Sequence, residues 1–160
     1  LDPAYTRIEL ASDLHYQQHY DLALGILENI LKNDSNNLDA ITLKADIYEH
    51  MELYDEAVVF AKKAISIEKN FSDALQVLAL VYSAQKQWNK LLKTSSKLID
   101  VSNPKDIFDY TSALHFRARA KYHLQDFEGF QKDMDALKSS GKIGRRIIKF
   151  IQKELKIKVI

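Results

Sequence analysis

The chain contains no cysteine and very little glycine or proline. Its 160 residues include four glycines and two prolines. Disulfides and thiolate metal sites are therefore excluded, and the many tight turns of a β-sandwich lack their usual residues. Ala, Leu, Lys, Glu and Gln are abundant, and these residues favour helices. The composition predicts an all-α protein.

The chain also lacks a strong net charge and a long apolar run. The formal net charge is +1, so there is no global electrostatic case for binding nucleic acid or a membrane. No apolar run approaches the ~20 residues of a spanning helix, and no signal peptide is visible. Because the chain begins at Leu1, we expect it to be excised from a longer protein. The sequence leaves the compartment undetermined, and we expect the cytoplasm.

A small residue recurs at a fixed spacing along the chain. Ala11, Ala45 and Ala79 are separated by equal steps, and Ala118 follows after a slightly longer one. An aromatic column has the same steps, at Tyr20, Tyr54, Trp88 and Phe127. By this periodicity we expect Tyr54, Trp88 and Phe127 to lie mostly in the core. Two columns that share a period of about 34 residues indicate a stacked array of helical pairs. Alanine is expected where two helices approach too closely for a larger side chain.

The periodicity predicts about nine helices in a single domain over residues 1–160. Four helical pairs are expected at about 4–37, 38–71, 72–105 and 106–140, followed by a capping helix at about 143–156. The longer step before the fourth pair is interpreted as a longer first helix, about 104–124, with Asn103 as its cap and Pro104 at its first position. A terminal helix with a polar outer face is what a repeat array requires.

These columns resemble the tetratricopeptide repeat, whose pattern is W-x2-L-G-x2-Y, then A-x3-F, then P. The resemblance covers about residues 4–137. It rests on Leu10-Ala11-x2-Leu14 with Tyr20-Asp21-Leu22-Ala23, on Ile41-x2-Lys44-Ala45-x2-Tyr48 with Tyr54-Asp55-Glu56-Ala57, and on Leu75-x2-Leu78-Ala79-x2-Tyr82. The pattern is broken by Arg7 at a bulky position, by the missing closing proline and by Phe130 in an alanine column. Sel1-like repeats have similar geometry but usually contain more glycine.

The resemblance implies a right-handed superhelix of antiparallel helical hairpins. In such an α-solenoid the first helix of each pair lines a concave groove, which commonly binds an extended peptide or a helix of a partner protein. The implied function is a non-catalytic scaffold for protein–protein interaction. Carried over by register, the groove lining is Tyr5, Ile8, Ser12, His15, Tyr16, Asp39, Thr42, Asp46, Glu49, His50, Asp73, Gln76, Leu80, Ser83, His115, Arg119, Tyr122 and His123.

Four carboxylates in the middle of this lining suggest a partner with basic residues. They are Asp39, Asp46, Glu49 and Asp73. A concave acidic surface attracts a basic segment. The alternative for Asp39 and Asp73 is a purely local one, because carboxylates in the first turn of a helix are stabilised by its dipole. Asp46 and Glu49 are mid-helix, and for them the two interpretations stay open.

Aromatic and histidine side chains on the lining have two interpretations each. Tyr5, Tyr16 and Tyr122 are expected in the groove, as anchors for a partner side chain or as ordinary packing. The four groove histidines are His15, His50, His115 and His123. They lie on different helices without an HExxH pair, so no metal site is expected, and we interpret them as exposed or half-buried polar residues.

Capture of a chaperone's C-terminal carboxylate is not expected. Members of the family that do this use Lys, Asn and Arg on three successive first helices. The matching positions here hold Ile8, Ser12, Leu43, Asp73 and Val77, or, one repeat later, Thr42, Asp46, Val77, Ser112 and Phe116. Neither set offers a cation or an amide.

The C-terminal stretch carries a local excess of positive charge. Residues 138–160 contain Lys138, Lys142, Arg145, Arg146, Lys149, Lys153, Lys156 and Lys158 against the single acid Glu154. This face could contact nucleic acid or an acidic surface, although a solvated cap is the favoured interpretation. The apolar residues of the tail 156–160 also suggest docking or self-association.

Nothing in the sequence indicates catalysis. There is no phosphate-binding glycine loop, no nucleophile elbow and no motif with metal-ligand spacing. Carboxylates and histidines are present, but no arrangement orders them into an acid–base or nucleophile pair. We expect no enzymatic activity and no cofactor.

Overall fold

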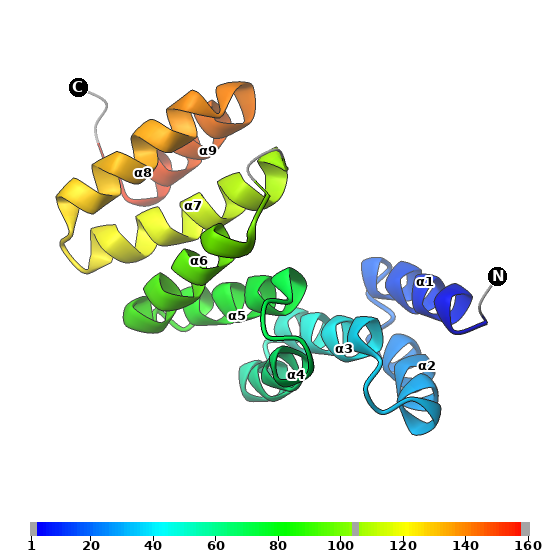
Figure 1. The fold of residues 1–160 in the computed structure, drawn as a ribbon. Helices are drawn as coiled ribbons and strands as arrows, with labels where there is room; N and C mark the ends of the chain where they lie inside the picture. Colours follow the sequence, from blue (N-terminus) through cyan, green and yellow to red (C-terminus); the bar gives the residue numbers. More distant parts are fainter. Residues whose placement is uncertain (1–2, 104–105, 158–160) are drawn as a thin grey trace. The chain divides into compact units, whose positions relative to one another are not determined.

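The protein is all-helical over the residues that its computed structural model describes, 3–103 and 106–157, with side chains described from Thr6 onward. The helices are α1 Pro3–Tyr16, α2 Tyr20–Asn33, α3 Leu38–His50, α4 Tyr54–Ile67, α5 Ser72–Ala84, α6 Trp88–Val101, α7 Ile107–His123, α8 Phe127–Ser139 and α9 Gly141–Glu154 (Figure 1). No strand occurs within these ranges. The predicted all-α class and the expected nine helices are therefore confirmed.

The first helix of each pair ends in the same way. The chain beyond the helix has a left-handed backbone at Gln18, Glu52, Lys86 and Gln125, with φ between 56° and 64°. The next amide then donates to a carbonyl five residues back, as His19 N does to Leu14 O at 2.8 Å. This is the Schellman motif. It returns at the same step as the alanine column in the first three pairs, so the repeat is visible in the backbone itself.

The alanine column is buried, as a column at close helix contacts requires. Ala11, Ala45, Ala79 and Ala118 are all fully buried. Ala23 and Ala57 in the second helices are fully buried as well. Because a buried alanine presents only a methyl group, the backbones of neighbouring helices can approach closely.

The chain divides into two compact units, with the boundary after Val81. In unit 1, α1 packs against α2 and α3, and α3 packs against α4. One core cluster of unit 1 is made of Ala11, Ala23, Leu27, Ile30, Ala40 and Ile47. Asn37 caps α3, since its side chain accepts a hydrogen bond from Ala40 N at 3.0 Å. The prediction of one domain over residues 1–160, with its repeat boundaries, stays a prediction.

In unit 2, α6 packs against α7, and α7, α8 and α9 lie side by side (Figure 1). One core cluster of this unit contains Leu114, Ala118, Phe130, Met134, Leu137 and Ile151. Gly144 allows α9 to approach α8 closely, because a Cβ atom there would lie 1.7 Å from the carbonyl oxygen of Leu137. Gly141 has φ +73° at the α8–α9 junction, a left-handed conformation that favours glycine.

Helix α7 begins later than the sequence suggested. Its first residue is Ile107, and its cap is Asp106, whose carboxylate accepts hydrogen bonds from Phe108 N and Asp109 N. The predicted cap, Asn103, is therefore wrong, and Pro104 lies outside the described residues. An aspartate that can accept amide hydrogen bonds outcompetes the Asn-Pro pattern as a helix start.

Another expectation fails at Phe127, which the aromatic column placed in the core. Its side chain is 58% exposed. Phe127 is the first residue of α8 and contacts Tyr122 edge to face, with ring centroids 5.8 Å apart. At this helix start the ring is therefore largely in solvent.

Candidate binding surface

The first helices of unit 1 bring five of the predicted groove residues together. His15 and Tyr16 end α1, while Asp46, Glu49 and His50 occupy the last two turns of α3. Residues three and four apart on a helix share one face, which explains the grouping on α3. The packing of α1 on α3 brings His15 and Tyr16 next to them. We call these five residues the acidic–aromatic face.

Asp46 lies between the two histidines. Its Oδ2 atom is 3.5 Å from His15 Nδ1, and its Oδ1 atom is 3.7 Å from His50 Nδ1. The Nδ1 atom of His50 also lies 3.3 Å from Glu49 Oε2 and 3.0 Å from the carbonyl oxygen of Asp46. One ligand atom each from His15, Asp46 and His50 lies within 4.8 Å of the others.

Burial shifts the pKa of two residues of this face, His15 and Glu49. Desolvation lowers the pKa of His15, with His50 acting in the same direction and the Asp46 carboxylate opposing. Desolvation also raises the pKa of Glu49. His15 is therefore held in its neutral form at pH 7. The prediction that the groove histidines are exposed or half-buried is wrong for His15, which is only 5% exposed.

Aromatic rings frame the cluster. The His15 ring stacks on Tyr16 at 5.6 Å and meets His50 edge to face at 4.6 Å between centroids. Tyr16 is 80% exposed, which is unusual for a large aromatic side chain. An exposed ring beside partly buried carboxylates has the makeup of a recognition surface.

The other predicted groove residues of unit 1 differ in exposure. Asp39 and Asp73 are exposed at their helix starts, whereas Ser12, Gln76 and Leu80 are half-buried. Ile8 packs against a core cluster. Thr42 is buried, and its hydroxyl donates to Leu38 O at 2.8 Å. The side chain of Tyr5 lies outside the described residues.

In unit 2, the predicted residues gather around Arg119 of α7. One guanidinium nitrogen donates to Ser83 Oγ, and another pairs with the Glu154 carboxylate of α9. The His123 ring stacks on Trp88 at 3.9 Å between centroids. Tyr122 is half-buried and contacts Phe130. The only cation in the predicted lining is thus already paired within its own unit.

His115 is the most strongly perturbed histidine among the described residues. Burial lowers its pKa to about 4, and the Arg119 charge adds to this. Its ring contacts Phe116 and Phe150. Its Nε2 atom is buried without a hydrogen-bond partner among the residues described. The apolar rings of Phe116 and Phe150 and the positive charge of Arg119 both favour the neutral form of the His115 ring.

Two residues of the group around Arg119 were not predicted as groove residues from the sequence. Trp88 was assigned to the core by its column, and Glu154 was noted only as the single acid of the basic stretch. The Trp88–His123 stack and the Arg119–Glu154 pair depend on tertiary placement. The only hint in the sequence was that isolated acid in a run of cations.

The basic side of α9 faces solvent, whereas its apolar side packs inward. Ile151 is fully buried in the core cluster of unit 2, and Leu155 and Ile157 pack against that cluster. The exposed side carries Arg145, Arg146, Lys149 and Lys153. The tail residue Ile157 therefore packs within the unit, while residues 158–160 lie outside the described part. Self-association through this tail stays a prediction.

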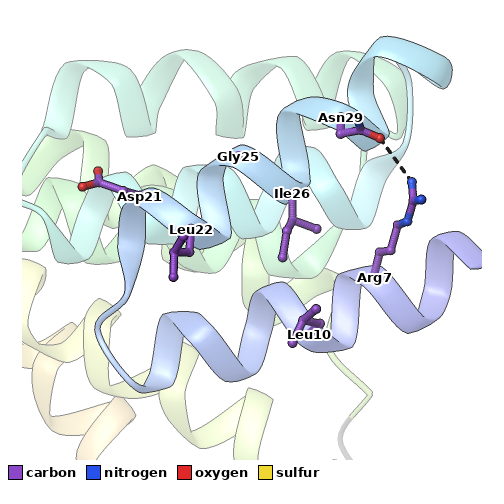
Figure 2. Close-up of a pocket in the computed structure, with 7 residues that line it drawn as sticks. All are labelled: Arg7, Leu10, Asp21, Leu22, Gly25, Ile26 and Asn29. Carbon is purple, nitrogen blue, oxygen red and sulfur yellow. Dashed lines mark hydrogen bonds between the residues drawn. The ribbon is translucent and has the colours of Figure 1, made fainter.

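An open apolar pocket of about 460 Å³ lies between α1 and α2, away from the predicted lining (Figure 2). Arg7 donates to Asn29 Oδ1 at 3.1 Å across it. Leu10 there is 52% exposed, whereas Lys44, at the equivalent place in the next repeat, is 7% exposed and pairs with Glu28 of α2. On α3 the equivalent face is covered by α2. On α1 this face is open, and the pocket lies there.

Solved structures share this fold. TTC0263 of Thermus thermophilus, a thermophilic TPR protein, matches with a TM-score of 0.71 and 18% identity over 95% of this chain and 82% of its own. YrrB, a TPR protein with an unusual peptide-binding site, matches with a TM-score of 0.60 and 18% identity over 92% of this chain and 84% of its own. The chain therefore has the tetratricopeptide-repeat fold, as the sequence columns predicted.

Sequence comparison adds one curated relative, the DnaJ protein P58IPK homolog B of Oryza sativa subsp. japonica. It is 28% identical over an alignment of 138 positions, which covers 79% of this chain. The chain spans only 28% of the length of that relative. No family model matches the chain. In the described residues, no helix combines the length and apolar character required to cross a membrane.

Proposed function

We propose that the chain is a non-catalytic protein-interaction scaffold. Its acidic–aromatic face, on α1 and α3, binds a peptide or helix that carries basic residues. The observation that carries this proposal is the convergence of Asp46 and Glu49 with the exposed ring of Tyr16. The peptide-binding site named for YrrB supports the same use of this fold.

The charges on this face suit a cationic side chain. The carboxylates of Asp46 and Glu49 are 30% and 16% exposed, and a charge pair is stronger at such sites than in bulk water. Neither residue stands in the first turn of α3, which begins at Leu38, so the helix dipole does not account for them. His15 is neutral and does not cancel the negative charge at pH 7.

Tyr16 supplies an anchor for the same partner. Interfaces place a few aromatic side chains at their energetic centre. The ring of Tyr16 is stacked on His15, and this contact limits its motion before binding. A partner lysine or arginine that approaches Asp46 would extend its aliphatic stem along this ring.

The test is affinity capture with identification of the bound proteins. The chain, stripped of metal ions, is compared with a double variant, Asp46→Lys with Glu49→Lys. A matched control, Glu56→Lys with Glu68→Lys, makes the same change in charge at exposed positions of α4 and its C-cap. Its two substitutions lie at opposite ends of that helix, where their effects on the dipole oppose each other.

The proposal requires partners that bind the wild type and the control but not the groove variant. Partners retained equally by all three proteins would contradict it. Partners lost from both variants would show a response to net charge alone, which would also contradict a defined surface on α1 and α3. Circular dichroism checks that each variant keeps its helical content.

A second candidate function is binding of nucleic acid or an acidic surface through α9. The four cations on its exposed side favour it, because each phosphate contact would release counterions. The measurement is the affinity for duplex DNA and single-stranded RNA at several salt concentrations. Arg145→Glu with Lys149→Glu should abolish a real interaction, whereas no shift of either nucleic acid at low salt would exclude it.

A further inference from the structure

We propose that His15, Asp46 and His50 form a binding site for a divalent transition-metal ion of the zinc type. Asp46 and His50 are one turn apart on α3, and His15 comes from the last turn of α1. One ligand atom from each lies within 4.8 Å of the other two. The sequence argument against a metal site was that the histidines lie on different helices, and the packing of α1 on α3 removes it.

The distance between His15 and Asp46 is close to what a metal ion needs. A tetrahedral zinc site with bonds of about 2.0–2.1 Å holds neighbouring ligand atoms roughly 3.3 Å apart. His15 Nδ1 and Asp46 Oδ2 are 3.5 Å apart and are not joined by a hydrogen bond in the described structure. Small side-chain rotations therefore bring both atoms onto one ion.

The hydrogen bonding of the second histidine leaves one ring nitrogen with a lone pair for an ion. His50 Nδ1 lies 3.0 Å from the carbonyl oxygen of Asp46, which can only accept, so the neutral ring carries its proton on Nδ1. The lone pair is then on Nε2. Histidine ligands commonly donate their other N–H to a backbone carbonyl or carboxylate in this way. Glu49, at 3.3 Å from the same Nδ1, reinforces that orientation.

The donor set selects the class of ion. Two imidazole nitrogens and one carboxylate oxygen suit zinc, cobalt, nickel or copper, whereas calcium and magnesium prefer oxygen ligands. Three protein ligands leave the fourth position for water or for a side chain of a bound partner.

The test is a titration of the metal-free chain with Co²⁺ and Zn²⁺, with no partner present. Bound Co²⁺ reports its geometry through visible absorption, and calorimetry gives the zinc affinity and stoichiometry. We expect one ion per chain. Asp46→Asn and His50→Ala should each weaken zinc binding at least about tenfold. The His50 side chain is 47% exposed, so its removal should leave the fold intact.

His19→Ala is the matched control, because His19 is an exposed histidine outside the three-residue cluster. Its zinc affinity should equal that of the wild type. Failure to reach one ion per chain, or equal affinity in wild type, Asp46→Asn and His50→Ala, would overturn the proposal. So would an equal loss in the His19 variant. The capture experiment above uses metal-free protein, so the two proposals can fail separately.

Discussion

The carboxylate of Asp133 on α8 is buried in unit 2 and accepts hydrogen bonds from two nitrogen atoms of Arg117 on α7. Arg117 Nη2 lies 2.7 Å from Asp133 Oδ1, and Arg117 Nε lies 3.0 Å from Oδ2. The Nζ atom of Lys121, one turn further along α7, is 3.0 Å from the same Oδ2. Asp133 is only 1% exposed. One buried acid thus holds two cations between α7 and α8.

Removing this acid should strongly destabilise the protein. In Asp133→Ala, Arg117 and Lys121 would remain partly buried without their counterion. Breaking a buried ion pair by removing one partner costs about 3–5 kcal/mol. Urea unfolding of wild type and variant measures the difference. The control is Asp100→Ala, at an exposed position on α6, which should change stability little. An exposed ion pair contributes about 1 kcal/mol or less. A loss no larger than this in Asp133→Ala would refute the role given to the buried pair.

Overpacking the alanine column should also be costly. Ala79 is fully buried on α5, and Ala79→Leu would force a much larger side chain into a contact built around a methyl group. The expected loss in the free energy of unfolding is on the order of 1–3 kcal/mol. Denaturant melts provide the measurement, with Ala84→Leu at the exposed end of the same helix as the control. A neutral result at position 79 would mean that the column does not mark a close contact.

Glycine at a left-handed helix end should stabilise the protein. Gln125 follows α7 with φ 64°, a conformation that costs a residue with a Cβ roughly 1 kcal/mol. Gln125→Gly should therefore raise the free energy of unfolding by up to about 1 kcal/mol. Gln131→Gly, in the exposed middle of α8, should lower it by a similar amount. Thermal and urea unfolding test both, and equal signs for the two variants would contradict the prediction.

Stability should depend on pH through His115. The folded pKa is about 4, and the ordinary value for a histidine, as in the unfolded chain, is 6.5. Between these values the unfolded chain binds a proton that the folded chain does not. The free energy of unfolding should therefore fall as pH decreases from about 6.5 toward 4, by on the order of 3 kcal/mol.

The His115 contribution is separated from the titration of carboxylates by a variant. His115→Gln has no proton to gain, so its loss of stability between neutral pH and the folded pKa of the histidine should be smaller than that of the wild type. Parallel unfolding curves at several pH values provide the comparison. Identical pH profiles for both proteins would show that the ring is not held neutral by its surroundings.

The sequence predicted the elements of the fold well, because their determinants are local and periodic. Ala11 and Ala45 recur with the backbone period, and the Schellman ends at Gln18 and Glu52 follow the same step. The start of α7 was missed, since the competition between Asn103-Pro104 and Asp106 as a cap is decided by hydrogen bonds that no periodicity reveals.

The candidate surface was only partly predictable. Register placed His15, Asp46 and His50 on one lining, but it carried no information on the distances between their side chains. The burial of His15 and the stack of Trp88 on His123 depend on packing between helices. Paired charges such as Arg119 with Glu154 have no spacing rule in the sequence, because the two residues lie on different helices.

The central claim is that Asp46 and Glu49 give the face on α1 and α3 a preference for basic segments. The most direct measurement is selection of peptides from a random displayed library on the metal-free wild type and on Asp46→Lys with Glu49→Lys. We predict that the wild type enriches lysine- and arginine-rich sequences and that the variant loses this enrichment. Selection of the same sequences by both proteins, or of acidic sequences by the wild type, would contradict the account.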